Sequence, residues 1–497
     1  MPLESLDHLI IGGAPESSSG GERIEVISPF TEQIIATVPA ATVADVDRAV
    51  AAARAAFDTG AWPRMAPSDR LAVLRRFRDT YAASQETIAE TVTAEMGCPI
   101  SLSRSYQTVA PKLILDAYLE IAAAYPFESV RRSDTGNALV VREPVGVVAA
   151  VVPWNVPQAT AMQKVIPALL AGCTVVLKPS PETPIDAYIL ADLLHRSGVP
   201  DGVLSVLPAG RDVSEYLISH PGVDKVSFTG STVAGRRIAS ICGNDLRRVT
   251  LELGGKSAGI FLDDADFDAA VESLRFAALR NSGQVCSLKT RLLVSKRKER
   301  DLVDRLEALI ATMPLGDPAD ADTQIGPMVT ARQRARIENY LEIGRAEGAS
   351  AVVGGGRPSE YDTGWFVEPT VFTGVTSDMR IAQEEIFGPV LSVITYEDED
   401  EAVRIANHST YGLSGAIYTS DVTHGVALAR RIRTGTVELN GSPAGFHAPM
   451  GGVKNSGIGR EAGPEGLEVY TEPKSIGVPA SFADEFDRAA RDGDAAA

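Results

Sequence analysis

Apolar residues recur at helical spacing near the N-terminus, from Val43 to Phe57. Thr42 and Asp45 stand three residues apart at the start of this pattern, which is typical of a capping box with Asp in place of Glu or Gln. Gly60 follows the last apolar position as a stop signal. The pattern therefore predicts an amphipathic helix that begins after Thr42 and ends before Gly60.

From residue 145 onward, short apolar runs alternate with helical patterns. The run 145–153 is too short to cross a membrane and is typical of a buried strand. Three further strands are predicted in 174–180, 204–210 and 225–231, and three helices in 163–171, 187–196 and 232–242. Strands that alternate with helices favour an α/β fold with a doubly wound parallel sheet, an architecture that binds dinucleotides.

A second α/β region begins after residue 254, and a strand–turn–strand pattern in 131–143 interrupts the first region. We expect a Rossmann-like dinucleotide-binding domain in 1–125 and 145–254 and a second α/β domain in 255–455. Residues 126–144 and 456–497 are expected to form a small β arm and a C-terminal segment. The acidic, Ala-rich stretch 480–497 is expected to be a mobile tail.

Composition narrows the function classes. The chain has 497 residues and a net charge of −18, which argues against nucleic acid and anionic membranes as partners. The first ten residues lack the pattern of a secretory signal. The four cysteines form no C-x-x-C pair, so no metal site or disulfide framework is predicted. These features favour a reduced, cytoplasmic protein.

Six short motifs occur in order along the chain: PWN (153–155), VVLKPS (175–180), FTGST (228–232), LELGGK (251–256), GQVC (283–286) and EEIFGP (384–389). Together they resemble the aldehyde dehydrogenase family over residues from about 25 to about 478. The resemblance implies an enzyme that oxidises an aldehyde to a carboxylic acid with NAD or NADP. The ordinary G-x-G-x-x-G fingerprint of dinucleotide binding is missing.

Four residues carry the chemistry that the resemblance implies. A thiolate can add to an aldehyde carbonyl, and Cys286 matches the family's nucleophile. Loss of hydride from the hemithioacetal leaves a thioester, which water can cleave. Asn155 and the backbone N–H of Cys286 would bind the oxyanion. Glu252 matches the general base, and Glu461 matches an acid that assists in proton relay.

The cofactor site is expected around the FTGST turn. Gly230, Ser231 and the helix N-terminus would meet the pyrophosphate, and Gly235 would permit tight packing. The resemblance adds seven cofactor contacts, which are Trp154, Lys178, Ser180, Leu253, Gly254, Glu385 and Phe387. The chain departs from the family at Pro181, where a ribose-binding Glu is frequent. Because Glu182 lies beside it, NAD is the expected cofactor, and NADP stays open.

The substrate mouth and the assembly are less specified. The resemblance places Val156, Thr160, Gln163, Phe446 and Met450 near the mouth. This lining lacks an obvious Arg clamp, so a dicarboxylate semialdehyde is less favoured, and the aldehyde is not identified. The resemblance implies that the α/β domain 255–455 is the catalytic domain and that the β arm is an oligomerisation arm. The segment 131–143 matches the family's arm, and an exposed strand edge invites pairing. We therefore expect a homodimer or a homotetramer.

Three alternatives remain open from the sequence. A cysteine hydrolase or acyltransferase could use Cys286 without redox chemistry, but it would need a His base that no local motif supplies. A non-catalytic binding relative would usually have lost Cys286 or Glu252. A branch of the family that transfers the acyl group to coenzyme A often lacks the general base, so Glu252 favours hydrolysis.

Overall fold

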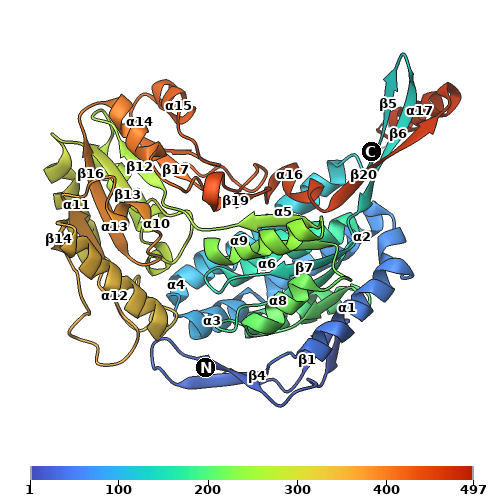
Figure 1. Ribbon diagram of the computed structural model, residues 1–497, viewed down its shortest axis with the longest axis horizontal. Helices are drawn as coiled ribbons and strands as arrows, with labels where there is room; N and C mark the ends of the chain where they lie inside the picture. Colours follow the sequence, from blue (N-terminus) through green and yellow to red (C-terminus); the bar gives the residue numbers. More distant parts are fainter. Residues whose placement is uncertain (1–2, 495–497) are drawn as a thin grey trace.

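The apolar runs that predict strands form the centre of the first sheet (Figure 1). In the computed structural model, which describes residues 3–494, this sheet has the order β19-β11-β10-β7-β8-β9-β1-β2. Its parallel strands are β7 (Val147–Val151), β8 (Thr174–Lys178), β9 (Leu204–Val206), β10 (Lys225–Thr229) and β11 (Arg248–Glu252). The antiparallel edge strands are β1 (Leu9–Ile11), β2 (Ala14–Glu16) and β19 (Gly457–Ile458).

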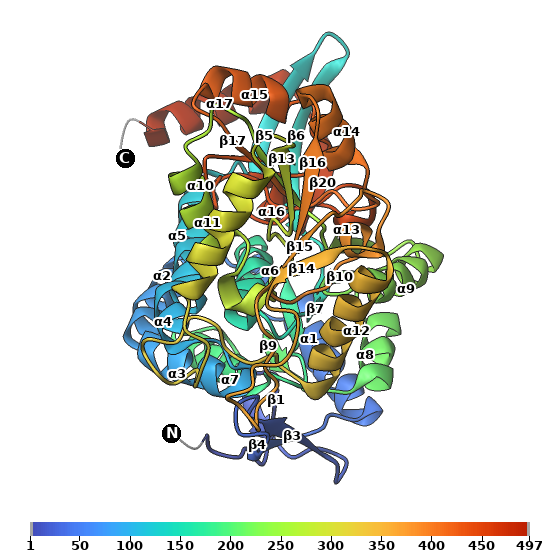
Figure 2. The same ribbon diagram turned by 90° about the vertical axis from the view of Figure 1, so that its left-hand side faces the viewer.

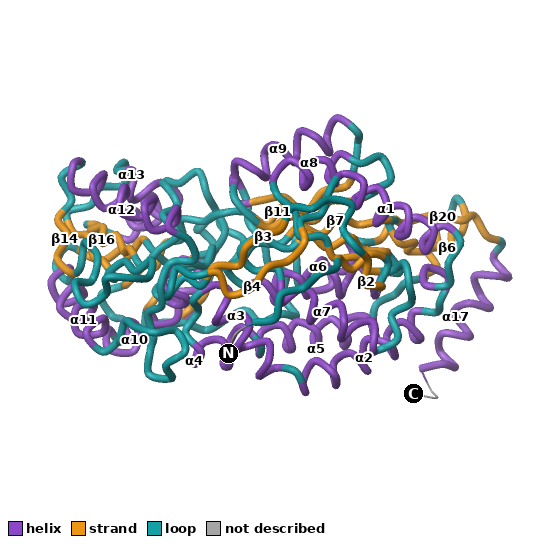
Figure 3. Tube along the Cα trace, turned by 90° about the horizontal axis from the view of Figure 1, so that it is seen from below, coloured by secondary structure: helices purple, strands orange, loops and turns teal. Residues whose placement is uncertain are grey.

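Helices cover both faces of this sheet (Figure 3). One face packs against α2 (Pro67–Ala83), α3 (Gln85–Met96), α5 (Val109–Ala124), α6 (Pro157–Ala171) and α7 (Ile185–Arg196). The other face packs against α1 (Val43–Asp58), α8 (Arg211–Ser219) and α9 (Thr232–Asn244). Every residue of β7 is buried, because an all-parallel strand covered on both sides must be apolar throughout.

The structure confirms the first predicted helix and corrects another. Thr42 and Asp45 form the reciprocal capping box that begins α1. Helix α6 begins at Pro157, six residues before the predicted start at residue 163. Proline is favoured in the first turn because its missing N–H has no intrahelical partner there. The apolar period alone did not show this early start.

The second sheet confirms the second α/β region. Its order is β14-β15-β16-β13-β12-β17-β18, and all neighbours are parallel except β14 and β15. The strands are β12 (Ala258–Phe261), β13 (Arg291–Ser295), β14 (Ser350–Val353), β15 (Thr370–Thr373), β16 (Val390–Tyr396), β17 (Gly415–Tyr418) and β18 (Glu438–Leu439). The flanking helices are α10 (Phe267–Ala277), α11 (Glu299–Ala311), α12 (Ala331–Ala346), α13 (Arg380–Gln383), α14 (Glu399–Asn407) and α15 (Val422–Ala429).

A three-stranded arm projects from the body of the protein, and a hairpin lies at the opposite end (Figures 1 and 2). The arm has the order β20-β6-β5, with β5 (Glu128–Ser133), β6 (Gly136–Pro144) and β20 (Thr471–Val478). The hairpin joins β3 (Arg23–Ile27) and β4 (Ile34–Pro39). Not all of the segment 456–497 lies on the arm, since β19 joins the first sheet and α16 (Gly463–Glu468) packs against α5 and α6.

The expectation of a mobile tail over 480–497 is wrong for the residues that the structure describes. Residues Ala480–Asp494 form α17, which packs against β5 and β6. Ala483 is fully buried, and Asp484 and Asp487 both pair with Arg132 of β5. The composition suggested disorder because these contacts join residues about 350 positions apart. Residues 495–497 lie outside the described range.

The remaining elements are short. They are α4 (Ile100–Leu102), a π-helical turn over Ser103–Gln107, and 3-10 turns at Trp62–Arg64, Arg280–Gly283 and Lys454–Ser456. Within residues 3–494, no helix combines the length and the apolar character that a membrane crossing requires.

Candidate active site

The order of strands in the first sheet reverses at β7. The chain adds β8 and β9 on one side of β7, and then β10 and β11 on the other side. In open α/β sheets, ligands bind where the strand order reverses in this way, beyond the carboxyl ends of the strands. The motif residues that end these strands or directly follow them are Trp154, Asn155, Lys178, Gly230, Ser231 and Glu252.

The nucleophile motif lies on a strained turn from the second region. Asn281 and Ser282 both adopt left-handed backbone conformations, with φ of 53° and 55°. Gly283 follows with φ of 79°, and a Cβ there would overlap the carbonyl group of Gly388. Two reasons therefore favour glycine at position 283: the backbone is left-handed, and Gly388 leaves no space for a side chain. The turn before Cys286 thus packs directly against the EEIFGP segment.

Asn155 is tied to this turn at both of its ends. Its side-chain amide donates a hydrogen bond of 2.9 Å to the carbonyl of Gln284. Its own carbonyl accepts hydrogen bonds from the amides of Gln107 (2.9 Å) and Asn281 (3.0 Å). A side-chain amide has two N–H groups, so one remains to bind an oxyanion beside Cys286.

The two glycines of LELGGK are explained by close approach. A Cβ on Gly254 would overlap the carboxylate of Glu385, and the N–H of Gly255 donates to that carboxylate at 3.0 Å. A Cβ on Gly255 would lie 2.6 Å from the carbonyl oxygen of Cys286. The segment between Glu252 and Lys256 therefore brings Glu385 and Cys286 to the same place.

The surroundings of Cys286 keep it as a thiol. Burial, together with the carboxylates of Glu385 and Glu252, raises the pKa of Cys286 to about 12, while the charge of Arg280 opposes this shift. The residue nevertheless keeps partial solvent exposure. Formation of the nucleophilic thiolate therefore requires an acceptor for the thiol proton close to the sulfur.

Glu252 belongs to a buried group of three charged residues. Glu252 and Glu461 are only 4% and 2% exposed, and Lys164 donates a hydrogen bond to one oxygen of Glu461. One oxygen of each carboxylate has no hydrogen-bond partner among the described residues. Burial and the nearby charge of Glu461 raise the pKa of Glu252 well above its usual range. Such a carboxylate binds a proton more readily than an exposed one.

Lys164 belongs to none of the sequence motifs. Every residue of α6 is buried, and a lysine inside such a helix is rare without a functional or structural partner. That partner, Glu461, is 297 residues away in the sequence. The helical pattern around Lys164 was visible, but the pairing depends on how the C-terminal segment folds back.

The aromatic rings of Trp154 and Phe387 are in contact beside the carboxyl end of β7. Their rings meet edge to face with centroids 5.4 Å apart. Phe387 has a left-handed backbone with φ of 65°, and its carbonyl accepts a hydrogen bond of 2.7 Å from the side-chain amide of Gln333. This contact holds a strained residue in place beside Glu385.

The N-terminus of α9 opens onto the same edge. Ser231 caps the helix by accepting the N–H of Ala234 at 3.3 Å, and Ser231 itself is exposed. A Cβ on Gly235 would lie 2.5 Å from the side chain of Leu253, so this glycine lets α9 pack closely on the end of β11. Exposed N–H groups at a helix N-terminus suit a phosphate.

Lys178, Ser180 and Glu182 gather after β8. Burial lowers the pKa of Lys178 to about 8, and the charge of Glu182 opposes the shift. The hydroxyl of Ser180 donates a hydrogen bond to the Glu182 carboxylate. Although Pro181 departs from the family pattern, a carboxylate therefore lies close to Lys178 and Ser180.

The predicted substrate residues come from two elements. Val156, Thr160 and Gln163 are buried near the start of α6, and the Gln163 amide lies 3.6 Å from the sulfur of Met450. Met450 also pairs through its backbone with Glu461. The structure thus links the predicted mouth to Glu461. Phe446 packs against the core around α5 and α6.

Arg280 is a charged residue near the nucleophile that sequence reasoning missed. Its guanidinium lies 4.3 Å from the ring centres of both Tyr106 and Phe276, and it forms no ion pair with a described carboxylate. Its Nε is buried without a hydrogen-bond partner among the residues of the structure. The sequence shows this Arg only six positions before Cys286, but not its stacking.

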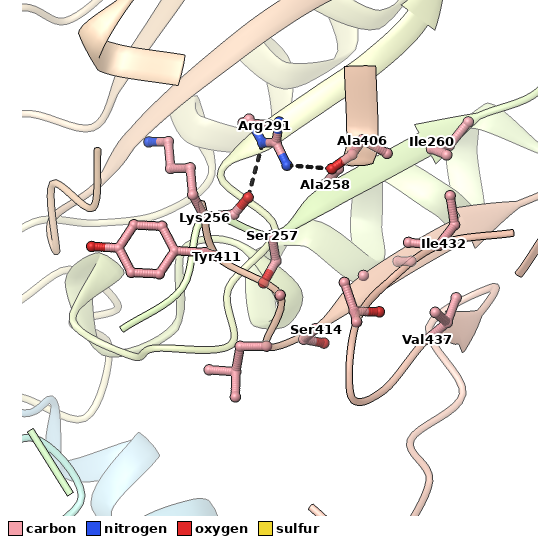
Figure 4. A pocket seen from close by; sticks show the side chains of 15 residues that line it. Lys256, Ser257, Ala258, Ile260, Arg291, Ala406, Tyr411, Ser414, Ile432 and Val437 are labelled. Atoms are coloured by element: carbon pink, nitrogen blue, oxygen red, sulfur yellow. Dashed lines mark hydrogen bonds between the residues drawn. The ribbon is translucent and has the colours of Figure 1, made fainter. Parts of the chain in front are cut away.

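A small cavity lies at the amino ends of β12 and β17 (Figure 4). Arg291, which is buried there, donates hydrogen bonds of 2.9 Å to the carbonyls of Lys256 and Ala406. Burial and the charge of Arg291 lower the pKa of Lys256 to about 7. The arginine anchors the chain directly after LELGGK, and so supports the position of Gly254 and Gly255.

No cluster of three or more metal-binding side chains occurs among residues 3–494. This edge of the sheet instead combines a helix N-terminus, a buried lysine with a carboxylate, two aromatic rings and a thiol. These features are typical of a dinucleotide-dependent enzyme.

The comparisons with known proteins agree with that class. The sequence profile described as "Aldehyde dehydrogenase family" matches residues 16–476, so the chain belongs to the aldehyde dehydrogenase family. The chain is 46% identical over 470 residues to a geranial dehydrogenase of Castellaniella defragrans, covering 94% of this chain and 98% of the relative. It is 42% identical over 460 residues to a 3-succinoylsemialdehyde-pyridine dehydrogenase of Pseudomonas, covering 92% and 95%.

Solved structures show the same fold. A Mycobacterium tuberculosis aldehyde dehydrogenase complexed with NAD+ matches with a TM-score of 0.95 and 43% identity, covering 96% of this chain and 99% of that one. A Pseudomonas syringae aldehyde dehydrogenase variant in complex with NAD+ and octanal matches with a TM-score of 0.92 and 40% identity, covering 95% and 97%. The chain thus has the α/β fold of these enzymes.

Proposed function

We propose that the protein oxidises an aldehyde to a carboxylic acid, with NAD as the cofactor, through a thioester on Cys286. The observation that carries this proposal is the meeting of Cys286, Asn155 and Glu252 at the switch point of the first sheet. An aldehyde panel with NAD and NADP, followed by absorbance of the reduced nicotinamide, tests it. Absence of reduction with every aldehyde contradicts it.

The first step is attack of the Cys286 sulfur on the aldehyde carbon. The thiol proton leaves to a base, and Glu252 lies close enough for its charge to act on the sulfur. The carbonyl oxygen becomes an oxyanion, which the free N–H of Asn155 and the backbone N–H of Cys286 stabilise. Losing one such donor typically slows a reaction by about 10²–10³-fold.

The residues present fit a dinucleotide. Ser231 and the open end of α9 would hold the pyrophosphate, Lys178 and Glu182 the adenosine ribose, and Glu385 the nicotinamide ribose. Ser180 orients Glu182 through its hydrogen bond, and Gly230, Gly235, Leu253 and Gly254 shape the floor. When bound, the oxidised nicotinamide accepts the hydride that the substrate loses. Trp154 and Phe387, whose rings are in contact, would lie beside it.

Hydrolysis of the thioester is assigned to Glu252. Its raised pKa suits a general base that activates water near neutral pH. Lys164 and Glu461 lie beside it and provide a route along which the proton moves away. Because this base is present, water rather than coenzyme A is the proposed acceptor of the acyl group.

Two of the compared proteins support a substrate with an apolar chain, although a third is named for 3-succinoylsemialdehyde-pyridine. Geranial and octanal both carry such a chain, and the predicted substrate entrance contributes the apolar side chains of Val156, Phe446 and Met450.

The alternative function of a cysteine hydrolase predicts that ester cleavage proceeds at the same rate with and without NAD. The other alternative, a non-catalytic relative, predicts no turnover of any aldehyde.

The cofactor choice rests on Glu182. We expect a preference for NAD, because a carboxylate beside Lys178 repels the extra phosphate of NADP. Glu182→Gln is expected to lower the ratio of kcat/KM with NAD to that with NADP by about tenfold, since one like-charge contact is worth roughly 1.4 kcal/mol. Glu465→Gln, an exposed change on α16, is the control. A wild-type preference for NADP would refute the choice.

The arm supports the proposal of a homodimer or homotetramer in the cytoplasm. Strand β5 forms one edge of the arm sheet, and an exposed edge can pair with another chain. All four cysteines are free, as expected in a reducing compartment. Size-exclusion chromatography with light scattering at micromolar concentration is expected to show a dimer or tetramer, and a stable monomer would contradict it.

A further inference from the structure

Gln107 contacts the site from an element that none of the family motifs includes. It ends the π-helical turn Ser103–Gln107, which lies between α4 and α5. Such wide turns in helical segments are frequent at functional sites, because they redirect a side chain. Here the redirected amide donates a hydrogen bond of 2.9 Å to the carbonyl oxygen of Asn155.

Burial of the Gln107 side chain is energetically unfavourable for its amide oxygen. It is 1% exposed, and its amide oxygen has no hydrogen-bond partner among the described residues. The amide nitrogen otherwise faces the sulfur atoms of Met96 and Cys98, each at 3.8 Å. A buried acceptor without a donor is unfavourable. The bond to Asn155 is therefore the single strong hydrogen bond that the structure gives this side chain.

The π-helical turn is also locked to the nucleophile turn. Tyr106 stacks on Arg280, and Asn281, the next residue, donates to the same carbonyl of Asn155 at 3.0 Å. Two amides from different elements thus fix one peptide group. Asn281 belongs to the turn that carries Cys286, whereas Gln107 connects Asn155 to α5 in the first core.

We propose that Gln107 is a positioning residue that fixes the Asn155 amide relative to Cys286. The proposal rests on the function of Asn155 proposed above. Without Gln107 the peptide after Asn155 keeps one donor, Asn281, and can tilt. An oxyanion donor works at distances of about 2.7–3.1 Å, so a displacement of a fraction of an ångström weakens transition-state binding.

The test replaces Gln107 by Leu and, separately, by Met, which fits the same space flexibly without an amide. We expect kcat with NAD and the best aldehyde of the panel to fall about tenfold or more. The KM for NAD should stay within about twofold of the wild-type value, because Gln107 touches no proposed cofactor residue. An unchanged kcat in both folded variants overturns the proposal.

Gln158→Leu is the matched control. Gln158 is also a fully buried glutamine, its amide also donates to a backbone carbonyl, that of Asp186 at 2.7 Å, and its oxygen also lacks a described partner. We expect a similar loss of thermal stability for Gln107→Leu and Gln158→Leu, but a fall in kcat only for the former. An equal fall in kcat for both variants would show that the effect is general destabilisation and would overturn the proposal.

A double-mutant cycle separates positioning from a mere structural contribution. If Gln107 acts through the Asn155 amide, the double variant Asn155→Ala/Gln107→Leu is no slower than Asn155→Ala alone. Fully additive losses would overturn the proposal. If Asn155→Ala itself retains wild-type kcat, the oxyanion function proposed for Asn155 fails, and this failure is distinct from a loss of aldehyde oxidation altogether.

Discussion

Replacing Cys286 by alanine is expected to remove aldehyde-dependent NADH formation, by at least about 10⁴-fold, because no other group can form the thioester. Binding of NAD should persist, because none of the residues proposed to hold the dinucleotide is changed. Steady-state absorbance measures the first effect, and fluorescence titration with NAD measures the second. Substantial remaining activity would place the nucleophile elsewhere.

Cys242→Ala is the matched control for this prediction. Cys242 is fully buried in the core that α9 forms with the first sheet, and it is not one of the predicted site residues. The substitution should lower the free energy of unfolding by about 1 kcal/mol, because a small buried side chain is removed, but it should leave kcat near the wild-type value.

The hydrolase alternative has its own test. If the wild-type protein cleaves an ester without NAD at the rate seen with NAD, that result favours the hydrolase.

Replacing Glu252 by glutamine is expected to separate the two halves of the reaction. The amide cannot activate water, so the thioester accumulates, and stopped-flow absorbance should show a burst of about one NADH per site. The slow phase that follows should be about 10²–10⁴-fold slower than wild-type turnover, the usual contribution of a general base. Loss of NAD binding without a burst would show that Glu252 is structural.

The same variant tests a pH dependence. The pKa of Glu252 is raised by burial and by Glu461, and the base acts only when deprotonated. Wild-type hydrolysis should therefore slow as the pH falls through this raised pKa, and Glu252→Gln should lack that limb. Glu95→Gln is the control, because Glu95 is also a buried carboxylate with a raised pKa, yet it caps α7 away from Cys286. The Glu95→Gln variant should show no burst of NADH.

Much of this fold follows from local sequence pattern. The apolar runs predict β7, β8, β9 and β10, because a strand covered on both faces is mostly apolar. Only β7 is apolar at every position, whereas β8, β9 and β10 also bury polar residues such as Ser205 and Lys225. Thr42 and Asp45 specify the start of α1 because a capping box involves neighbours only. The start of α6 and the helix α17 were missed, since the first depends on a proline in the first turn and the second on packing against the arm.

The motifs predicted Cys286, Asn155 and Glu252 as candidate site residues, because each stands in a recognisable string at a strand end or turn. The sequence could not show Lys164 beside Glu461, Gln107 on the Asn155 carbonyl, or Arg280 between two rings. Each of these depends on residues that are distant in sequence or on a turn whose direction is not a local property. The spacing of apolar residues indicates which face of a helix or strand is buried. It does not indicate which side chain of another element contacts that face.

By itself, then, the sequence determined the class of fold and the family, because these are encoded in local periodicity and in short motifs. Only the tertiary structure decided why Gly254 and Gly255 must lack side chains, how Glu252 acquires a raised pKa, and what holds Asn155 in place. The physical reason is that close packing and desolvation arise between elements, after the two sheets have come together.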